Sequence, residues 1–162
     1  MKIAYVTMQF PVASETFAAV EIRALRSLGA EVSVLAYRGA PARAQTMLAE
    51  RGLAELPVDQ GGLAANLRGL ALVFLRPADS FPLITTIFAH CWCRPLHLLK
   101  ALALLPRSLD LLQRLEALKA DVLHLFWGHY PSLLGLLVKR RLPRVVVTQF
   151  LGAYDPEEGL SL

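Results

Sequence analysis

Two loops of the sequence carry side chains that could contact a ligand. His129 follows an apolar run at residues 121–127 and precedes a predicted helix. Asp155 follows a second apolar run at 144–149, in a loop where Gly152 allows close approach of the backbone. Ligands of open α/β sheets bind at the loops that follow the strands, and a helix N-terminus favours anions. His129 and Asp155 are therefore candidate ligand contacts, and the alternatives are a solvent-exposed histidine and a turn or capping aspartate.

Two further titratable side chains fall inside predicted elements. Glu21 lies at the edge of the apolar face of a helix predicted over 15–28. A buried carboxylate must find a partner or take up a proton, so Glu21 either pairs with a nearby arginine or positions the first loop. His124 lies within the apolar run at 121–127, where it is either a satisfied core histidine or a ligand contact.

Several common classes of site are excluded by their missing motifs. The first loop lacks the glycine pattern that binds a dinucleotide, and the sequence contains no Walker loop, nucleophile elbow or paired-histidine zinc motif. His90, Cys91, Cys93 and His97 are metal-binding residue types. Zinc sites are usually assembled from paired ligands on separate elements, so an ordinary buried helix is expected there. We predict no cofactor-binding and no metal-binding residues.

The elements that hold these loops can be read from apolar periodicity and from proline and glycine positions. A strand is predicted at residues 2–8, then a helix at 15–28 with Ser14 as its N-cap, then a strand at 31–37. Such β-α-β units are nearly always parallel and right-handed. The loop at 9–14 should therefore lie at the carboxyl edge of the sheet.

The rest of the chain continues the alternation after a helical middle section. The apolar runs at 121–127 and 144–149 are predicted strands, separated by a helix that begins with Pro131. The middle section predicts one short strand and five helices: near 56–58, and at 43–52, 61–75, 80–93, 96–105 and 108–118. The fold class is α/β, a parallel sheet of about four or five strands with helices on both faces. Three loops are expected to share one edge of that sheet: 9–17, 128–132 and 150–155.

Composition limits the kinds of protein and partner. With 162 residues, 55% hydrophobic and 19% charged, the chain suits one ordered domain. Its formal charge of +4 suits an anionic partner, but the one basic cluster, at 139–144, has no interleaved aromatic residues, so nucleic-acid binding is not expected. Cys91 and Cys93 are too close to form a stapling disulfide, which makes a reducing, cytosolic compartment the default. No apolar run reaches the roughly eighteen residues of a membrane span.

Five short segments form a recognisable pattern. Residues 10–17 read FPVASETF, 21–25 read EIRAL and 29–32 read GAEV. Residues 121–128 read DVLHLFWG, and 150–155 read FLGAYD. This pattern resembles the N-terminal half of bacterial GT-B glycosyltransferases of family 4, in particular those that assemble capsular polysaccharide and exopolysaccharide. Phe126 and Leu151 stand where that family often has histidines.

The resemblance implies a fold and an activity. Residues 1–162 would form a truncated Rossmann-like N-terminal domain with a helical insertion in the middle, and the donor-binding C-terminal domain would be absent. The chain would be the acceptor-binding half of a retaining, nucleotide-sugar-dependent glycosyltransferase (a hexosyltransferase type) of polysaccharide or glycolipid synthesis, inactive alone. His129 and Asp155 would be catalytic. The substrate contacts would be Ser14, Glu15, Thr16, Phe17, Gly128, Gly152 and Tyr154.

The resemblance also implies partners and a location. The acceptor would be a sugar or a lipid-linked sugar, and the missing domain would bind the nucleotide-sugar. Apolar helices with basic residues suit docking from the cytoplasm on the anionic inner face of the cell membrane, and a solvated basic face is the alternative: Arg68, Arg94, Lys100, Arg107 and Arg114. A truncated domain should expose apolar patches. The alternative functions are a non-catalytic binding or scaffold subunit of a split transferase and a small flavodoxin-like ligand binder.

Overall fold

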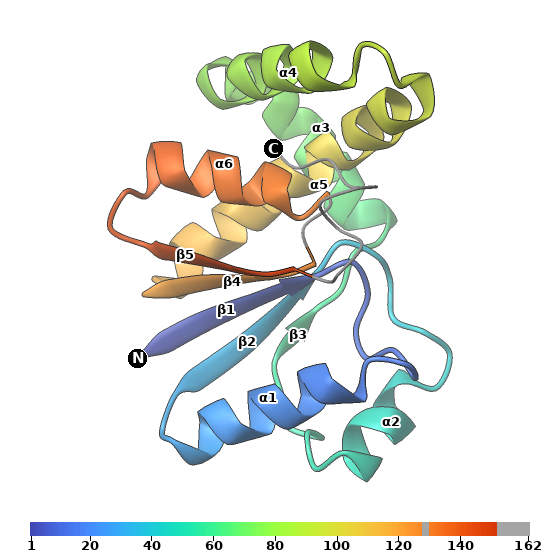
Figure 1. Cartoon of the computed structure of the whole chain (residues 1–162), viewed down its shortest axis with the longest axis vertical. Coiled ribbons are helices and arrows are strands. Elements are labelled where there is room, and N and C mark those ends of the chain that lie inside the picture. The colour runs from blue at the N-terminus through green and yellow to red at the C-terminus, as the bar shows by residue number, and fades with distance from the viewer. Residues whose placement is uncertain (128–129, 152–162) are drawn as a thin grey trace.

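Five parallel strands form the centre of the molecule, in the order β3-β2-β1-β4-β5 (Figure 1). The computed structural model describes residues 1–127 and 130–151. The strands are β1 (Lys2–Thr7), β2 (Glu31–Ala36), β3 (Val58–Asp59), β4 (Val122–Phe126) and β5 (Val146–Phe150). Every neighbouring pair is parallel, so the carboxyl ends of all five strands lie at one edge. The predicted α/β, Rossmann-like fold is confirmed.

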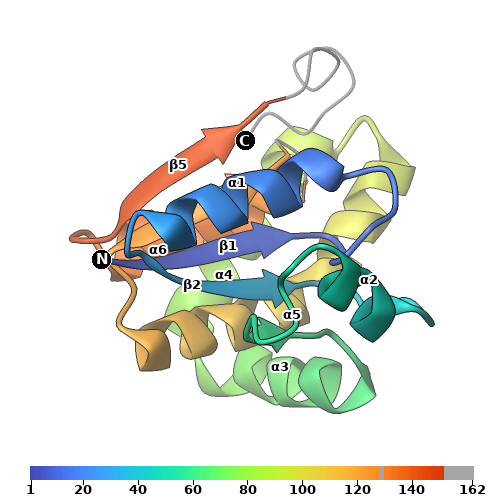
Figure 2. The same cartoon turned by 90° about the horizontal axis from the view of Figure 1, so that it is seen from below.

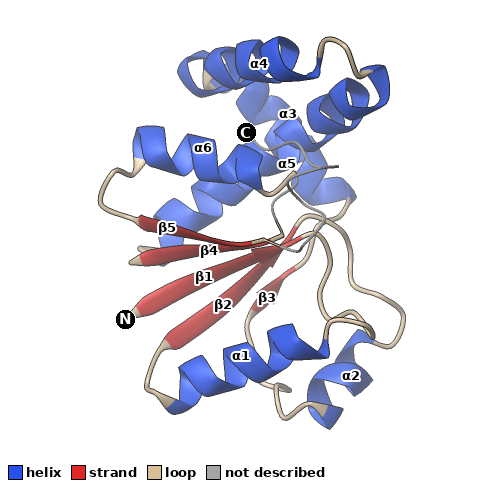
Figure 3. Ribbon diagram, in the orientation of Figure 1, coloured by secondary structure: helices blue, strands red, loops and turns tan. Residues whose placement is uncertain are grey.

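Helices cover both faces of the sheet (Figure 3). One face carries α1 (Thr16–Ser27) and α2 (Ala44–Glu50), and Figure 2 shows α1 lying across the sheet. The other face carries α5 (Pro95–Leu118) and α6 (Ser132–Arg141), with α3 (Leu63–Leu75) and α4 (Pro77–Cys91) packed on the far side of α5 and α6 (Figure 1). The middle of the chain is thus the predicted helical insertion.

The central strand shows why the sheet must be covered on both faces. In β1, Ile3 and Tyr5 belong to the core under α1, while Ala4 and Val6 belong to the core under α5 and α6. All four side chains are buried. Because successive residues of a strand point to opposite faces, a run that is apolar at every position must be buried on both sides.

Two details of the predicted helices are wrong. The separate helices expected at 96–105 and 108–118 form one helix, α5, which continues through Pro106. Proline removes one helical hydrogen bond, but Leu105 and Leu109 on either side of it are buried in the core, and this packing favours a continuous helix. Ser14 does not cap α1, because Glu15 occupies the N-cap position and no side chain bonds to the first-turn amides.

A buried arginine connects α5 to the carboxyl ends of β2 and β3. Arg107 is 0% exposed and pairs with buried Asp110. Its Nη2 also donates to the carbonyl of Ala36 at 2.7 Å and to Asp59 Oδ1 at 2.8 Å. A full set of partners of this kind is what permits a charge in a protein interior. The expectation that Arg107 belongs to an exposed basic face is therefore wrong.

Helices α3 and α4 are rich in apolar residues. Across the described residues, no single helix is both long and apolar enough to cross a bilayer. Helices α3 and α4 reach that length and composition only as a pair, and the pair is bent by 99°.

Candidate functional site

The carboxyl ends of β1, β4 and β5 bring three distant parts of the chain together. The loop after β1 leads into α1 through Glu15, Trp127 directly follows β4, and Phe150 ends β5. This edge of an open parallel sheet is where ligands bind in such folds. The predicted convergence of the first loop with the segments after β4 and β5 is confirmed as far as the described residues reach.

A carboxylate and an indole connect the first two of these segments. Trp127 Nε1 donates a hydrogen bond to Glu15 Oε1 at 3.0 Å. The other oxygen, Oε2, is buried and accepts no hydrogen bond from any described residue. Glu15 is the N-cap residue of α1, where the helix dipole stabilises negative charge. Glu15 therefore keeps an acceptor oxygen that no described residue uses, and a ligand hydroxyl would have to move the side chains that bury it to donate to it.

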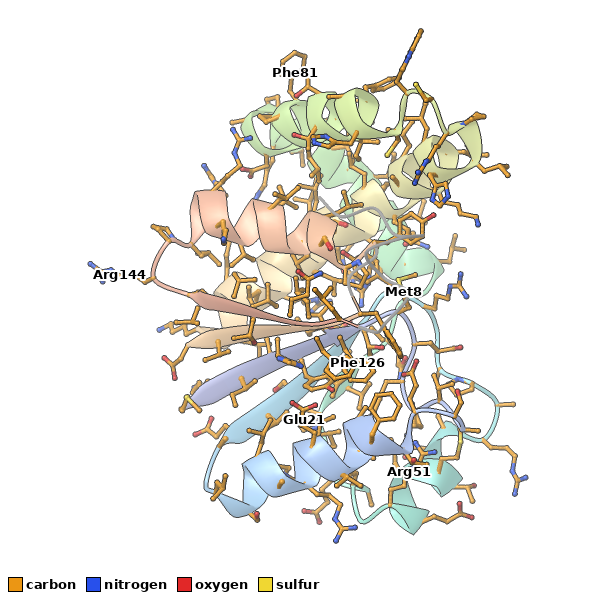
Figure 4. All side chains as sticks on the ribbon, in the orientation of Figure 1. Met8, Glu21, Arg51, Phe81, Phe126 and Arg144 are labelled. Atoms are coloured by element: carbon orange, nitrogen blue, oxygen red, sulfur yellow. The ribbon has the colours of Figure 1, made fainter. Side chains whose placement is uncertain are left out.

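Three phenylalanine rings pack around the indole that bonds this carboxylate. Phe126 is fully buried and stacks on Phe150, with ring centroids 5.3 Å apart. The ring centroids of Phe17 and Phe126 are 5.2 Å apart. The Trp127 ring lies nearly perpendicular to those of Phe17 and Phe150, with centroid distances of 6.1 and 5.8 Å. Phe17 and Phe150 remain 42% and 40% exposed. We call the group of Phe17, Phe126, Trp127 and Phe150 the aromatic cluster (Phe126 is labelled in Figure 4).

Trp127 has an unusual backbone conformation. Its φ of 79° lies in the left-handed region, which bulky side chains rarely adopt. Such a conformation persists only where neighbouring contacts hold it, and it is concentrated at functional sites. Here the Glu15 hydrogen bond and the ring contacts hold the indole in place.

The first loop is anchored by two side chains that sequence reasoning missed. Arg51, at the end of α2, donates from Nη2 to the carbonyls of Val12 and Ala13 at 3.0 and 3.3 Å. Gln60 Nε2 donates to the carbonyl of Phe10 at 2.8 Å. Nothing in the local sequence around Arg51 or Gln60 signals this role, because the contacts join residues about forty to fifty positions apart.

A polar group lies beneath the aromatic cluster, between α1 and the sheet. The Tyr5 hydroxyl donates to Glu21 Oε2 at 3.0 Å, and His124 Nε2 lies 3.7 Å from Glu21 Oε1. On its other side, His124 Nδ1 lies 2.9 Å from Thr148 Oγ1. Figure 4 shows Glu21 pointing from α1 toward the sheet. Among the described residues, the partners of Glu21 are a tyrosine and a histidine rather than the arginine that was one predicted alternative.

Burial controls the ionisation of this group. Burial raises the pKa of Tyr5 far above its usual range, and the adjacent Glu21 carboxylate raises it further. Burial also lowers the pKa of His124, and the opposing attraction of Glu21 is the smaller effect. His124 is therefore neutral near pH 7, and its approach to Glu21 is not an ion pair.

The lowered pKa of His124 predicts that the stability of the fold depends on pH. The unfolded chain binds a proton at His124 near its ordinary pKa of about 6.5, while the folded chain binds it only at lower pH. The free energy of unfolding should thus be highest above that pH and fall as the pH drops below it. Urea denaturation of wild-type protein and His124→Gln at several pH values measures the effect, which the substitution should reduce. His90→Gln, an exposed histidine of α4, is the control. Equal pH profiles for wild type and His124→Gln would contradict this assignment.

The predicted site residues divide into two groups. Glu15 and Phe17 contact Trp127, and Ser14 and Thr16 are exposed beside them. The remaining predicted residues lie outside the described part of the chain: Gly128, His129, Gly152, Tyr154 and Asp155.

The four residues of metal-binding type lie around the turn between α4 and α5. Cys91 is buried in α4, Cys93 is exposed, and His97 Nδ1 lies 3.4 Å from the Tyr130 hydroxyl. Within residues 1–127 and 130–151, no group of three or more histidine, cysteine or acidic side chains is arranged to hold a metal ion.

The fold and this edge define an α/β protein of the Rossmann-like class with a candidate ligand site at the carboxyl ends of its strands. No protein-family model matches the sequence, and no curated protein matches it.

Proposed function

We propose that this chain is the acceptor-binding half of a retaining, nucleotide-sugar-dependent glycosyltransferase of polysaccharide or glycolipid synthesis. The observation that carries the proposal is the buried Oε2 of Glu15, which accepts no hydrogen bond from any described residue, next to an aromatic cluster in which Phe17 and Phe150 are partly exposed. The sequence resemblance of residues 10–17 to the family 4 opening pattern supports the same reading.

The chemistry of this edge suits a sugar. A pyranose ring offers apolar C–H faces and a rim of hydroxyl groups. Flat aromatic rings accept the apolar face, and a few placed polar groups fix the orientation, as in most small-molecule sites. A carboxylate accepts hydrogen bonds only, so Glu15 Oε2 matches a hydroxyl donor.

The reaction explains why the proposal assigns the acceptor and the donor to two different domains. Transfer from a nucleotide-sugar needs the acceptor hydroxyl oriented toward the sugar and stabilisation of the departing diphosphate. In the proposal, His129 and Asp155 contact the reacting sugar, and a second, donor-binding domain supplies the groups for the diphosphate. The isolated chain is inactive, and the enzyme works in the cytoplasm, peripherally on the inner face of the cell membrane.

Tryptophan fluorescence tests sugar binding directly. The sequence has two tryptophans, so Trp92→Phe leaves Trp127 as the only reporter. Titration of this variant with methyl hexopyranosides and short polysaccharide oligomers should change the emission saturably. For the sugar that binds most tightly, Glu15→Gln should raise the Kd about fivefold to tenfold, because it removes a charge-assisted hydrogen bond.

A matched control is Glu50→Gln, which neutralises an exposed carboxylate on α2 and should leave binding unchanged. A silent Trp127 with every sugar, or an equal effect of both substitutions, would count against the proposal. Turnover of a UDP-sugar or GDP-sugar by residues 1–162 alone would show that the acceptor-half assignment is wrong.

A second candidate is a non-catalytic scaffold subunit of a split transferase. The observation that favours it is β5, which ends the sheet and is largely exposed, with Val146 at 57%. An edge strand with free backbone groups can pair with a strand of another chain. Copurification of a separate Rossmann-type chain would favour this candidate.

A further inference from the structure

Helix α4 carries a stripe of large apolar side chains directed away from the core. Phe81, Phe88 and Trp92 are spaced by seven and four residues on α4, so they share one helix face. Phe81 is 68% exposed and Trp92 is 77% exposed. Figure 4 shows Phe81 projecting from α4 away from the sheet.

Two more exposed leucines lie beyond the turn, at the start of α5. Leu96 and Leu99, one turn apart at the start of α5, are 70% and 66% exposed. The turn itself is closed by a hydrogen bond from the Arg94 amide to the Cys91 carbonyl at 2.8 Å. We call Phe81, Phe88, Trp92, Leu96 and Leu99, together with Arg94 and Lys100, the α4–α5 patch.

The exposed charges of residues 63–105 are all positive. From residue 63 to residue 105 the sequence has a single acidic residue, Asp79, which is buried and paired with Arg141 Nε at 3.0 Å. Arg94 and Lys100 are exposed, and no described carboxylate forms an ion pair with either of them. Within residues 63–105, the patch therefore offers bulky apolar groups and positive charge without an exposed acidic side chain.

We propose that the α4–α5 patch docks on an anionic lipid bilayer, with its aromatic side chains in the headgroup region and Arg94 and Lys100 at the lipid phosphates. Helices that lie on a membrane combine Trp, Phe and Leu on one face with Lys and Arg beside them. The bend of 99° between α3 and α4 fits a surface association better than a span. The proposal concerns the membrane location included in the proposed function and does not depend on sugar binding.

Charge argues against a second copy of the chain as the occupant. In a two-fold dimer the same patch meets itself, so the arginine and lysine of one copy would face those of the other. No exposed acidic side chain lies between residues 63 and 105 to neutralise them. Anionic lipid supplies the missing negative charge.

Vesicle binding tests the proposal with the full chain. In the Trp127→Phe variant, Trp92 is the only tryptophan. Its emission should shift to the blue with vesicles of phosphatidylcholine and phosphatidylglycerol, and much less with phosphatidylcholine alone. Cosedimentation should show that Arg94→Glu with Lys100→Glu weakens binding more than tenfold, at about fivefold for each cation. Phe81→Ser with Trp92→Ser should also weaken it more than tenfold.

Helix α1 provides matched controls on the opposite face of the sheet. Arg23→Glu with Arg26→Glu reverses two exposed cations, and Val20→Ser with Leu28→Ser removes two exposed apolar side chains. Both pairs should leave vesicle binding unchanged. The proposal would be overturned if the control pairs lost as much vesicle binding as the patch variants, or if the protein bound both lipid mixtures equally. It would also be overturned if the wild-type chain were a dimer and the patch variants were monomers. Phe81→Ser with Arg94→Glu should leave the Trp127 response to sugars intact, which separates this test from that of the proposed function.

Discussion

Replacement of Arg107 by methionine should lower the free energy of unfolding by about 3–5 kcal/mol, because it leaves a buried charge without its main partner. Asp110 is 1% exposed, and among the described residues it would keep a single ion-pair partner, Arg68 Nε, at 3.0 Å. The carbonyl of Ala36, at the end of β2, would also lose its donors. Since a domain is stable by only about 5–15 kcal/mol in total, this loss is large.

Urea denaturation of three variants tests the explanation. If the cost arises from the orphaned carboxylate, Arg107→Met combined with Asp110→Leu should recover part of the lost stability, since both charges are then removed. Arg114→Met removes a half-exposed partner of Asp59 and should cost less than about 1 kcal/mol. A loss of this small size for Arg107→Met itself would show that the buried network contributes little.

Gly69→Ala should destabilise the protein by about 1–3 kcal/mol, opposite in sign to the usual effect of this change in a helix. A Cβ at residue 69 would overlap the carbonyl group of Pro106, where α3 packs closely on α5. These are backbone atoms, which cannot rotate away, so one helix must move. Thermal unfolding measures the effect.

Asn66→Ala is the matched control for Gly69→Ala. Asn66 lies one turn earlier on α3 and is exposed, so alanine there should be neutral or slightly stabilising through helix propensity. If Gly69→Ala were as stable as Asn66→Ala, the close approach of α3 to α5 at Pro106 would be ruled out.

Much of the fold could be predicted because its signals are local. The apolar runs at 2–8, 31–37 and 121–127 mark strands buried on both faces, and strands β1, β2 and β4 lie within them. Pro106 misled the prediction for α5, because a local rule for helix breaking was outweighed by burial of leucines against the sheet. The Ser14 cap failed similarly, since the chain enters α1 one residue later.

The candidate site was less predictable because its contacts are distant in sequence. Glu15 and Phe17 stand in a recognisable motif, but their partner Trp127 lies on the other side of the helical insertion. Glu21 was correctly singled out as a carboxylate on the sheet-facing edge of its helix, while its partners Tyr5 and His124 follow only from the strand order. The positive charge of Arg107 suggested a surface role, and only the tertiary structure reveals the two carboxylates that pair with it in the interior.

The central position of β1 has a consequence for how the chain folds. Ile3 pairs with Val32 on one side and with Val122 on the other, and the Lys2 amide bonds to Asp121 across 119 positions of sequence. Closing a long loop costs more entropy than closing a short one, and non-local pairing slows folding. The unit β1-α1-β2 should therefore assemble first. The edge of β1 that β4 covers should stay open until the helical insertion has docked, and this interval is when the nascent chain is most prone to aggregate.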